Sequence, residues 1–254
     1  YEISCSLVGS EMCIRDSSEM MLIRAAHSCI FCYSVLMPYD VKREQKNLYV
    51  PGKTPAIVEV PAMQFVAVRG AGDPNDPHGE YQSALQLLYG ISFTIKMSEK
   101  SKDSRDHIAG YMPYVVPPLE GLWWMGRNAS EPVDYARKQD FQWISMIRLP
   151  EFVTADAFEH ARGLFANKHP EADVSRARLF EYDEGLCAQV MHVGPYDTEP
   201  ATIAALDKFV GEHGYALDFS DARHHHEIYL SNPQRCAPDR LRTVIRHPVR
   251  MASE

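Results

Sequence analysis

The chain has 254 residues, of which 45% are hydrophobic and 24% are charged, and its formal net charge at pH 7 is −8. This length allows one large domain or two small ones with real hydrophobic cores. An acidic chain lacks the basic surface that nucleic-acid binding requires, so a neutral or cationic small molecule is the easier partner.

The N-terminal segment does not resemble a natural domain. Residues 7–17 (LVGSEMCIRDS) look like a translated sequencing adapter. Residues 20–36 are apolar but lack the roughly 18 consecutive apolar residues of a membrane helix. A signal peptide or a metal or redox site at Cys29 and Cys32 is the alternative, but neither a small-residue cleavage site nor a second cysteine pair accompanies them. We therefore expect residues 1–36 to be read-through and the native start to lie near Met37.

The remaining residues, 37–254, are expected to form a single domain. They retain Cys187 and Cys236 as their cysteines. Two cysteines argue against a disulfide framework and suit a reducing cytoplasm.

The first half of this domain predicts a strand-helix-strand-strand order. Alternating apolar residues predict strands at 56–60 and 63–69, joined as a hairpin by Pro61-Ala62. Helical spacing then predicts a helix over 80–89 that stops at Gly90. Further strands are expected at 92–97, 119–124 and 141–148, followed by a helix over 155–167 that Thr154 caps.

The second half repeats this order. A second hairpin (178–182 and 186–192), a helix (201–210) and strands at 215–219 and around Glu227 are expected, and the motif Ile-Arg-x-Pro ends both halves, at 147–150 and 245–248. We therefore expect an α+β fold of two tandem modules, about 55–150 and 175–250, related by a pseudo-twofold axis. Their antiparallel sheets would carry helices on one side and leave a central ligand groove, with Glu120 and Glu227 at equivalent positions beside it.

Glu227 is the most informative residue, because it places a carboxylate in the middle of what otherwise reads as a short strand with one polar and aromatic face and one mostly apolar face. Side chains alternate along a strand, so Glu227 shares a face with His225 and Tyr229, while His226 and Ile228 point the other way. Burying an unpaired carboxylate costs several kcal/mol. Glu227 therefore belongs either to a salt bridge on an edge strand or to a functional site.

Two neighbouring tryptophans, Trp123 and Trp124, must face opposite ways if they lie on a strand. One can then pack against a helix while the other lines a cavity. Ordinary core packing of both is the alternative.

Four segments together resemble the stand-alone branch of the GyrI-like small-molecule-binding superfamily. They are LEGLWW at 119–124, HVGPYDTEP at 192–200, HHEIYLSNP at 225–233 and RHP at 246–248, and the similarity runs from about Tyr39 to Val249. The resemblance implies the tandem-module fold and a central cleft in which aromatic side chains surround a glutamate that meets hydrophobic, often cationic, ligands. Two departures are Asn232, where Asp is more usual, and the additional His224.

The same resemblance implies roles for individual residues. Glu227 matches the key glutamate, and Trp123, Trp124 and Tyr229 match aromatic positions. Some stand-alone members are similar to cyclopropanoid cyclopropyl hydrolases, which open the strained ring of DNA-alkylating antibiotics. That chemistry needs a base for water and a donor for the carbonyl.

We expect Glu227 to be the base, with desolvation raising its pKa toward neutrality. The donor could be Tyr114, Tyr229, His225 or His192, and the flat ligand would stack on Trp123 or Trp124. Glu120 would lie beside the groove, and no cofactor or metal is expected.

Three other functions remain open. A sequestering or sensing protein would use Glu227 only to pair with drug cations. A transcriptional regulator or gyrase inhibitor is less favoured, because neither a helix-turn-helix nor a basic face is predicted. A zinc site at His192, His224 and His226 lacks a cysteine or acid to complete its ligand shell. No membrane or nucleic-acid partner is expected.

Overall fold

The computed structural model describes residues 37–126, 134 and 136–252. The expectations for residues 1–36 lie outside this range. Tyr39–Glu254 forms one compact unit, and all features below belong to it. None of the described helices combines the length and the hydrophobicity needed to cross a membrane.

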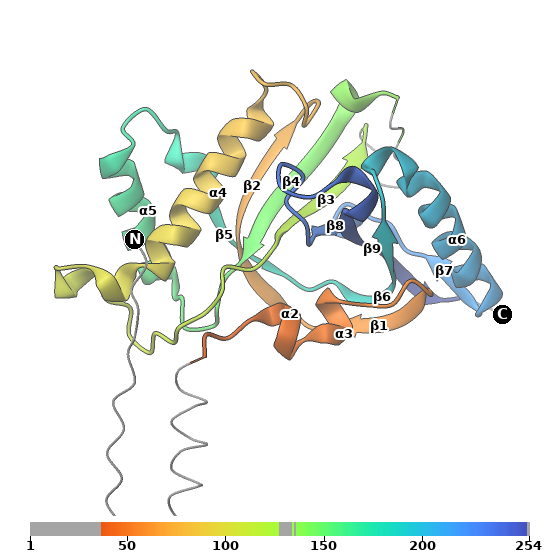
Figure 1. Cartoon of the computed structure of the whole chain (residues 1–254), viewed down its shortest axis with the longest axis horizontal. Helices are drawn as coiled ribbons and strands as arrows, with labels where there is room; N and C mark the ends of the chain where they lie inside the picture. The colour runs from red at the N-terminus through yellow and green to blue at the C-terminus, as the bar shows by residue number, and fades with distance from the viewer. Residues whose placement is uncertain (1–36, 127–133, 135, 253–254) are drawn as a thin grey trace, which may run out of the picture. The chain divides into compact units, whose positions relative to one another are not determined.

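An antiparallel sheet is the centre of this unit (Figure 1). Its order is β1 (Ala56–Val60), β6 (Gly185–Val193), β9 (Arg242–Met251), β8 (His225–Tyr229), β3 (Leu119–Met125), β4 (Phe141–Arg148), β2 (Met63–Ala71) and β5 (Arg178–Tyr182), with β7 (Tyr215–Leu217) paired to β9. The order is symmetric about its middle. Strands from the two halves occupy matching positions on either side: β3 and β8 in the centre, then β4 and β9, then β2 and β6, and β5 and β1 at the edges. The pseudo-twofold axis therefore passes between β3 and β8, and the α+β duplication is confirmed.

The two predicted hairpins do not form, although all four of their strands do. β1 pairs with β6, and β2 pairs with β5, so each half contributes its first strand to the sheet of the other half. A two-residue hairpin turn needs residues with positive φ, which Pro61 cannot adopt. In the second connection the positive φ falls on Gly185, the first residue of β6. The exchange ties the two halves into one continuous sheet.

The predicted strand at 92–97 is wrong, because α4 (Glu80–Lys96) continues through Gly90. Ile91 and Ile95 extend its buried stripe by a further turn. A Cβ on Gly90 would lie 2.1 Å from the Phe165 ring, so this glycine permits close packing of α4 on α5 (Ala155–Lys168) and is not a helix stop. Thr154 caps α5 as predicted, accepting a hydrogen bond from the Ala157 amide at 3.2 Å.

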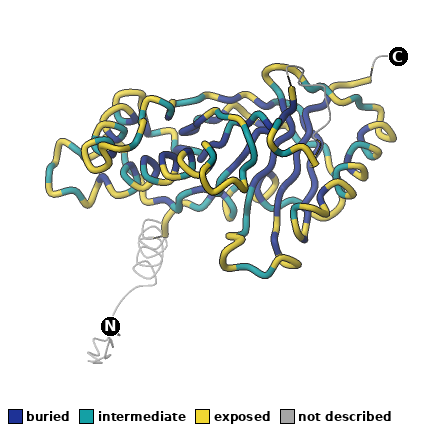
Figure 2. The backbone as a smooth tube through the Cα atoms, turned by 90° about the horizontal axis from the view of Figure 1, so that it is seen from above, coloured by how far each residue is buried: buried dark blue, intermediate teal, exposed yellow. Residues whose placement is uncertain are grey.

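The long helices lie on one face of the sheet, as predicted. α4 and α5 pack on residues such as Val66 and Ile147, and α6 (Glu199–Glu212) packs on Val190 and Ile245. The other face is covered by the short helices α2 (Val41–Glu44) and α3 (Lys46–Tyr49). Figure 2 shows the central strands as the most buried part of the chain. The middle of the long-helix face, over β3 and β8, lies between α4 and α6 (Figure 1).

Candidate functional site

A cavity of about 740 Å³ lies over β3 and β8, between α4 and α6. Its wall includes a group of aromatic and acidic side chains, namely Tyr81, Trp123, Phe141, Tyr196, Glu199, Glu227 and Tyr229. The rings pack on one another, with the Trp123 centroid 5.7 Å from those of Tyr81 and Phe141. Lys138 and Asp197, whose charged groups are 3.6 Å apart, also line it. The cavity therefore offers flat apolar surfaces around Glu199 and Glu227, with the carboxyl group of Asp197 also in its wall.

Glu227 is held by donors on both oxygens. His225 Nε2 lies 2.9 Å from its Oε1, and the Tyr229 hydroxyl donates to its Oε2 at 2.6 Å. Trp123 Nε1 in turn donates to the Tyr229 hydroxyl at 2.9 Å. The predicted sharing of one strand face by His225, Glu227 and Tyr229 is confirmed, and the alternative of an edge-strand salt bridge is wrong, because β8 is a central strand.

Gly121 lies directly across from Glu227 on β3. A Cβ at this position would lie 2.5 Å from Trp123 Nε1 and 3.3 Å from the Tyr229 hydroxyl. Only a glycine therefore lets the Trp123 indole lie over residue 121 and reach Tyr229 on the neighbouring strand β8.

Gly121→Ala should displace the Trp123 indole and weaken its bond to Tyr229. We expect a loss of about 1–3 kcal/mol of stability from overpacking, with altered tryptophan fluorescence. Thermal unfolding and emission spectra measure both. Gly163→Ala on α5 is the matched control, because its Cβ meets open space and alanine favours the helix. If Gly121→Ala and the parent had the same melting temperature and the same emission spectrum, the Trp123 indole would not depend on a glycine at position 121.

The predicted rise in the pKa of Glu227 is wrong. Burial is the largest single influence and does raise this pKa. The hydrogen bonds from His225 and Tyr229, together with the positive charge of His225, outweigh it and hold the pKa below its ordinary value. Glu227 is therefore an ionised carboxylate at neutral pH.

Glu199, the first residue of α6, is a further acid in the cavity wall and is not among the residues predicted from the sequence. It is fully buried, and burial followed by the charge of neighbouring Glu227 raises its pKa to about 10. The cavity thus contains a carboxylic acid beside a carboxylate, an arrangement that separates acid and base roles. A second acid in the 192–200 motif was the available signal, but nothing in that motif indicated that Glu199 faces Glu227.

Glu199→Gln should stabilise the protein, and more so as the pH rises. Because the pKa of Glu199 is raised from 4.5 to about 10, the stability of the parent is full below pH 4.5 and falls as the pH rises toward 10. The variant has no proton to lose, so its melting temperature should exceed the parent's by several degrees at pH 8 and hardly at all at pH 4.5. Glu212→Gln, an exposed change on the same helix, is the control. A difference in melting temperature that stays the same at all pH values would show that Glu199 is not a buried neutral acid.

Three of the four predicted donors lie outside the cavity wall. His192 is buried under α6, where Nδ1 contacts Thr202 Oγ1 at 2.8 Å and Nε2 contacts the Pro195 carbonyl at 3.2 Å. Tyr114 packs against Phe152, with ring centroids 6.0 Å apart. His225 lies behind Glu227 and contacts it without lining the cavity. Trp123 and Tyr229 line the cavity as expected.

Glu120 is not the counterpart of Glu227, so this prediction is wrong. Glu120 pairs with Ile228 across β3 and β8, whereas Glu227 pairs with Gly121. Cross-strand partners share a face, so the two glutamates point to opposite faces of the sheet. Glu120 instead contacts His226 at 3.0 Å, in a buried cluster beneath α3.

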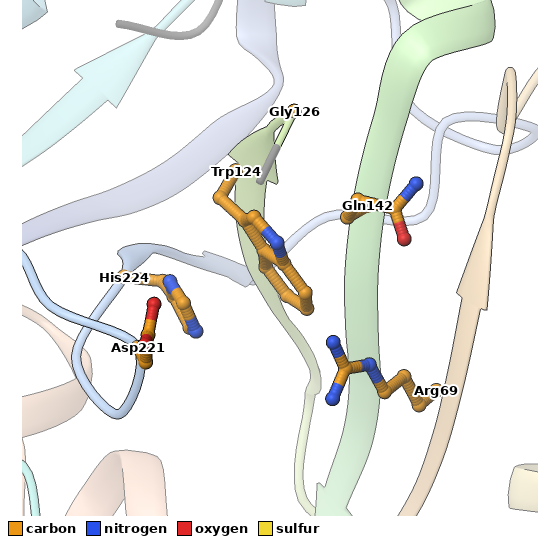
Figure 3. A pocket seen from close by; sticks show the side chains of 6 residues that line it. All are labelled: Arg69, Trp124, Gly126, Gln142, Asp221 and His224. Carbon is orange, nitrogen blue, oxygen red and sulfur yellow. The ribbon is translucent and has the colours of Figure 1, made fainter. Parts of the chain in front are cut away.

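Trp124 points away from Trp123, as the strand alternation predicts, and lines a second cavity of about 690 Å³ (Figure 3). Its ring stacks on His224 at 4.1 Å, and the Arg69 guanidinium lies 5.1 Å from the ring centre. Trp124 therefore cannot stack on a ligand held by Glu227.

The histidines of the zinc alternative do not converge. His192 lies on the long-helix face, whereas both ring nitrogens of His226 are within 3.0 Å of buried carboxylates on the opposite face. Within the described part of the chain, no group of three or more His, Cys, Asp or Glu residues is placed to hold a metal ion.

A duplicated sheet whose central strands carry an aromatic cavity around a carboxylate defines a small-molecule-binding domain. The chain belongs to the GyrI-like small molecule binding domain family, which matches residues 53–250.

Three solved structures from Listeria innocua are similar to this chain. An uncharacterized conserved protein is 40% identical with a TM-score of 0.77, and two hydrolases are 39% and 38% identical with TM-scores of 0.74 and 0.75. In each comparison 84% of this chain and 100% of the other are covered. No curated protein matches the chain.

Proposed function

We propose that this domain is a hydrolase that opens electrophilic cyclopropane-containing natural products, with Glu227 as the base for water. The observation that carries the proposal is the pair of Glu227 and Glu199 in one aromatic cavity, the first ionised and the second neutral. The relatives described as hydrolases support the reaction class. The biological role would be detoxification of DNA-alkylating antibiotics.

In the proposed reaction Glu227 acts as the base and Glu199 acts as the acid. Water attacks the cyclopropane methylene, a C–O bond forms, and the strained C–C bond breaks. Its electrons pass to the carbonyl oxygen as the dienone ring becomes aromatic. Glu227 accepts the proton of the attacking water, and Glu199 donates its proton to the oxygen that becomes a phenol. The neutral Glu199 replaces the four donors proposed from sequence.

The cavity wall suits such a substrate. Trp123, Tyr81 and Phe141 form apolar ring surfaces on which a planar dienone can stack. Stacking orients the methylene toward Glu227, and a fixed orientation lowers the barrier for attack by water.

A spirocyclopropyl cyclohexadienone tests the proposal. Loss of dienone absorbance should be faster with the protein than in buffer, and one protein molecule should convert many substrate molecules. In H₂¹⁸O the opened product should carry one ¹⁸O on the former methylene carbon. Ring opening no faster than in buffer would reject the hydrolase proposal for this substrate class.

Sequestration of hydrophobic cations is the second candidate, and the ionised Glu227 favours it. Aromatic rings around a buried carboxylate attract organic cations. Binding can be followed by quenching of tryptophan fluorescence with matched cationic and neutral dyes. Strong preference for the cation without any turnover would favour this function.

A further inference from the structure

The second cavity, of about 690 Å³, lies on the face of the sheet away from Glu227. Trp124 pairs with Gln142 across β3 and β4, and Gln142 pairs with Ala71 across β4 and β2. Cross-strand partners share a face, as do residues two apart on one strand, so Arg69 lies on this face as well. The second cavity has the volume of a small-molecule site.

Both faces of the Trp124 indole are covered. The His224 ring stacks on one face at 4.1 Å, with an angle of 15° between the two planes. A ring in this position occupies that face, so the Arg69 guanidinium, 5.1 Å from the indole centre, lies over the other one (Figure 3). Trp124 and His224 are 7% and 5% exposed. A buried, fixed pair of rings therefore positions the guanidinium by a cation–π contact.

Arg69 and Gln142 hold unused hydrogen-bond donors at the second cavity. Within the described ranges, neither the Arg69 guanidinium nor the Gln142 amide has a hydrogen-bond or ion-pair partner. Figure 3 shows both side chains on the same side of Trp124. A guanidinium presents N–H donors in a planar fork that matches the two oxygens of a carboxylate, and an amide NH₂ adds two more donors. The pair is therefore suited to an oxyanion.

The charges of the wall favour a single negative charge on the ligand. His224 is neutral at pH 7, because burial, aided by the charge of Arg69, outweighs a hydrogen bond to the Asp221 backbone and lowers the pKa of His224. Arg69 is then the cation of the wall, and Asp221 beside His224 is its acid (Figure 3). Asp221 repels a dianion more strongly than a monoanion, and one guanidinium neutralises one carboxylate.

We propose that the second cavity is a separate ligand site, which binds a small organic carboxylate through the Arg69 guanidinium and the Gln142 amide. None of the described residues that line it also lines the cavity around Glu227. The proposal therefore does not depend on the hydrolase function. The two cavities select opposite charges, since Glu227 repels anions and Arg69 attracts them.

Benzoate and benzamide test this site, because they share a ring and differ in charge. By isothermal titration calorimetry at pH 7.5, benzoate should bind at least about tenfold more tightly than benzamide. Arg69→Gln should lower the affinity for benzoate to that for benzamide. Arg178→Gln, which removes an exposed arginine from edge strand β5, is the matched control and should bind benzoate like the parent.

Four results would overturn the proposal. They are the absence of benzoate binding at millimolar concentrations, equal affinities for benzoate and benzamide, equal benzoate affinities for Arg69→Gln and Arg178→Gln, and tighter binding of inorganic phosphate than of benzoate. The last result would show a site for inorganic anions. If Arg69→Gln does not fold, Arg69→Lys takes its place. Lysine keeps the charge but lacks the planar fork, so benzoate should bind more weakly than to the parent.

Nitrogen-15 NMR shows where benzoate binds. The side-chain signals of Gln142 and Trp124 should shift when benzoate is added to the parent, and they should not shift in Arg69→Gln. Gln142→Leu identifies the amide signal by its loss and should also weaken benzoate binding. Shifts of Trp123 without shifts of Gln142 and Trp124 would place benzoate in the cavity around Glu227 and overturn the proposal.

Discussion

Glu227→Gln should lower the rate of ring opening by about a hundredfold to ten-thousandfold, the usual contribution of a positioned general base. Glutamine keeps the size of the side chain and can accept from Tyr229, but it cannot take a proton from water. A neutral dienone should bind almost as tightly as before, because stacking on the aromatic wall is unchanged. The loss should therefore appear in kcat and hardly in KM.

The control for this variant is Glu59→Gln, which changes an exposed glutamate on edge strand β1. It should leave turnover and binding unchanged. If Glu227→Gln turned over as fast as Glu59→Gln, Glu227 would not be the base. If neither protein exceeded buffer and Glu227→Gln lost affinity only for cations, the domain would be a binding protein.

The orientation of the site could be predicted from strand alternation alone. His225, Glu227 and Tyr229 share a face because side chains alternate along a strand, and this rule needs no tertiary information. The same rule placed Trp123 and Trp124 on opposite faces. It could not say which tryptophan meets Glu227, because that depends on which face the long helices cover.

The pairing of strands could not be predicted in the same way. β1 and β2 are joined by a short connection, but their partners come from the other half of the chain. The equivalence of Glu120 and Glu227 failed for a related reason, because register across β3 and β8 decides which residues share a face. Such long-range pairings leave no local sequence signal.

The acid–base pair also depended on tertiary structure. Glu199 lies 28 positions before Glu227 in the sequence, on a helix that follows β6 and not on the same strand. Only the packing of α6 on the sheet brings them together. Strand alternation places the donors His225 and Tyr229 beside Glu227, but whether their effect on its pKa outweighs that of burial depends on the packed structure.

A second group of buried charges lies on the opposite face of the sheet. His226 contacts Glu120 at 3.0 Å and Glu184 at 2.9 Å, and Arg246 contacts Glu184 at 2.7 Å. These four residues are at most 1% exposed. Burial alone would lower the pKa of His226, but Glu184 and Glu120 raise it to about 9. Two carboxylates and two cations therefore balance in a site without solvent.

His226→Gln should destabilise the protein by about 3–5 kcal/mol at pH 6.5, because two buried carboxylates then share a single cation. For a unit of this size the melting temperature should fall by roughly 10 °C. The pKa of His226 is raised from 6.5 to about 9, so its stabilisation is full below pH 6.5 and disappears as the pH rises through 9. The difference in melting temperature between the variant and the parent should therefore become smaller between pH 6.5 and pH 9.5, as thermal unfolding can measure. His213→Gln, an exposed change at the end of α6, is the control and should show no such gap. A gap that stays constant across this pH range would mean that His226 stabilises the sheet by packing and not by its charge.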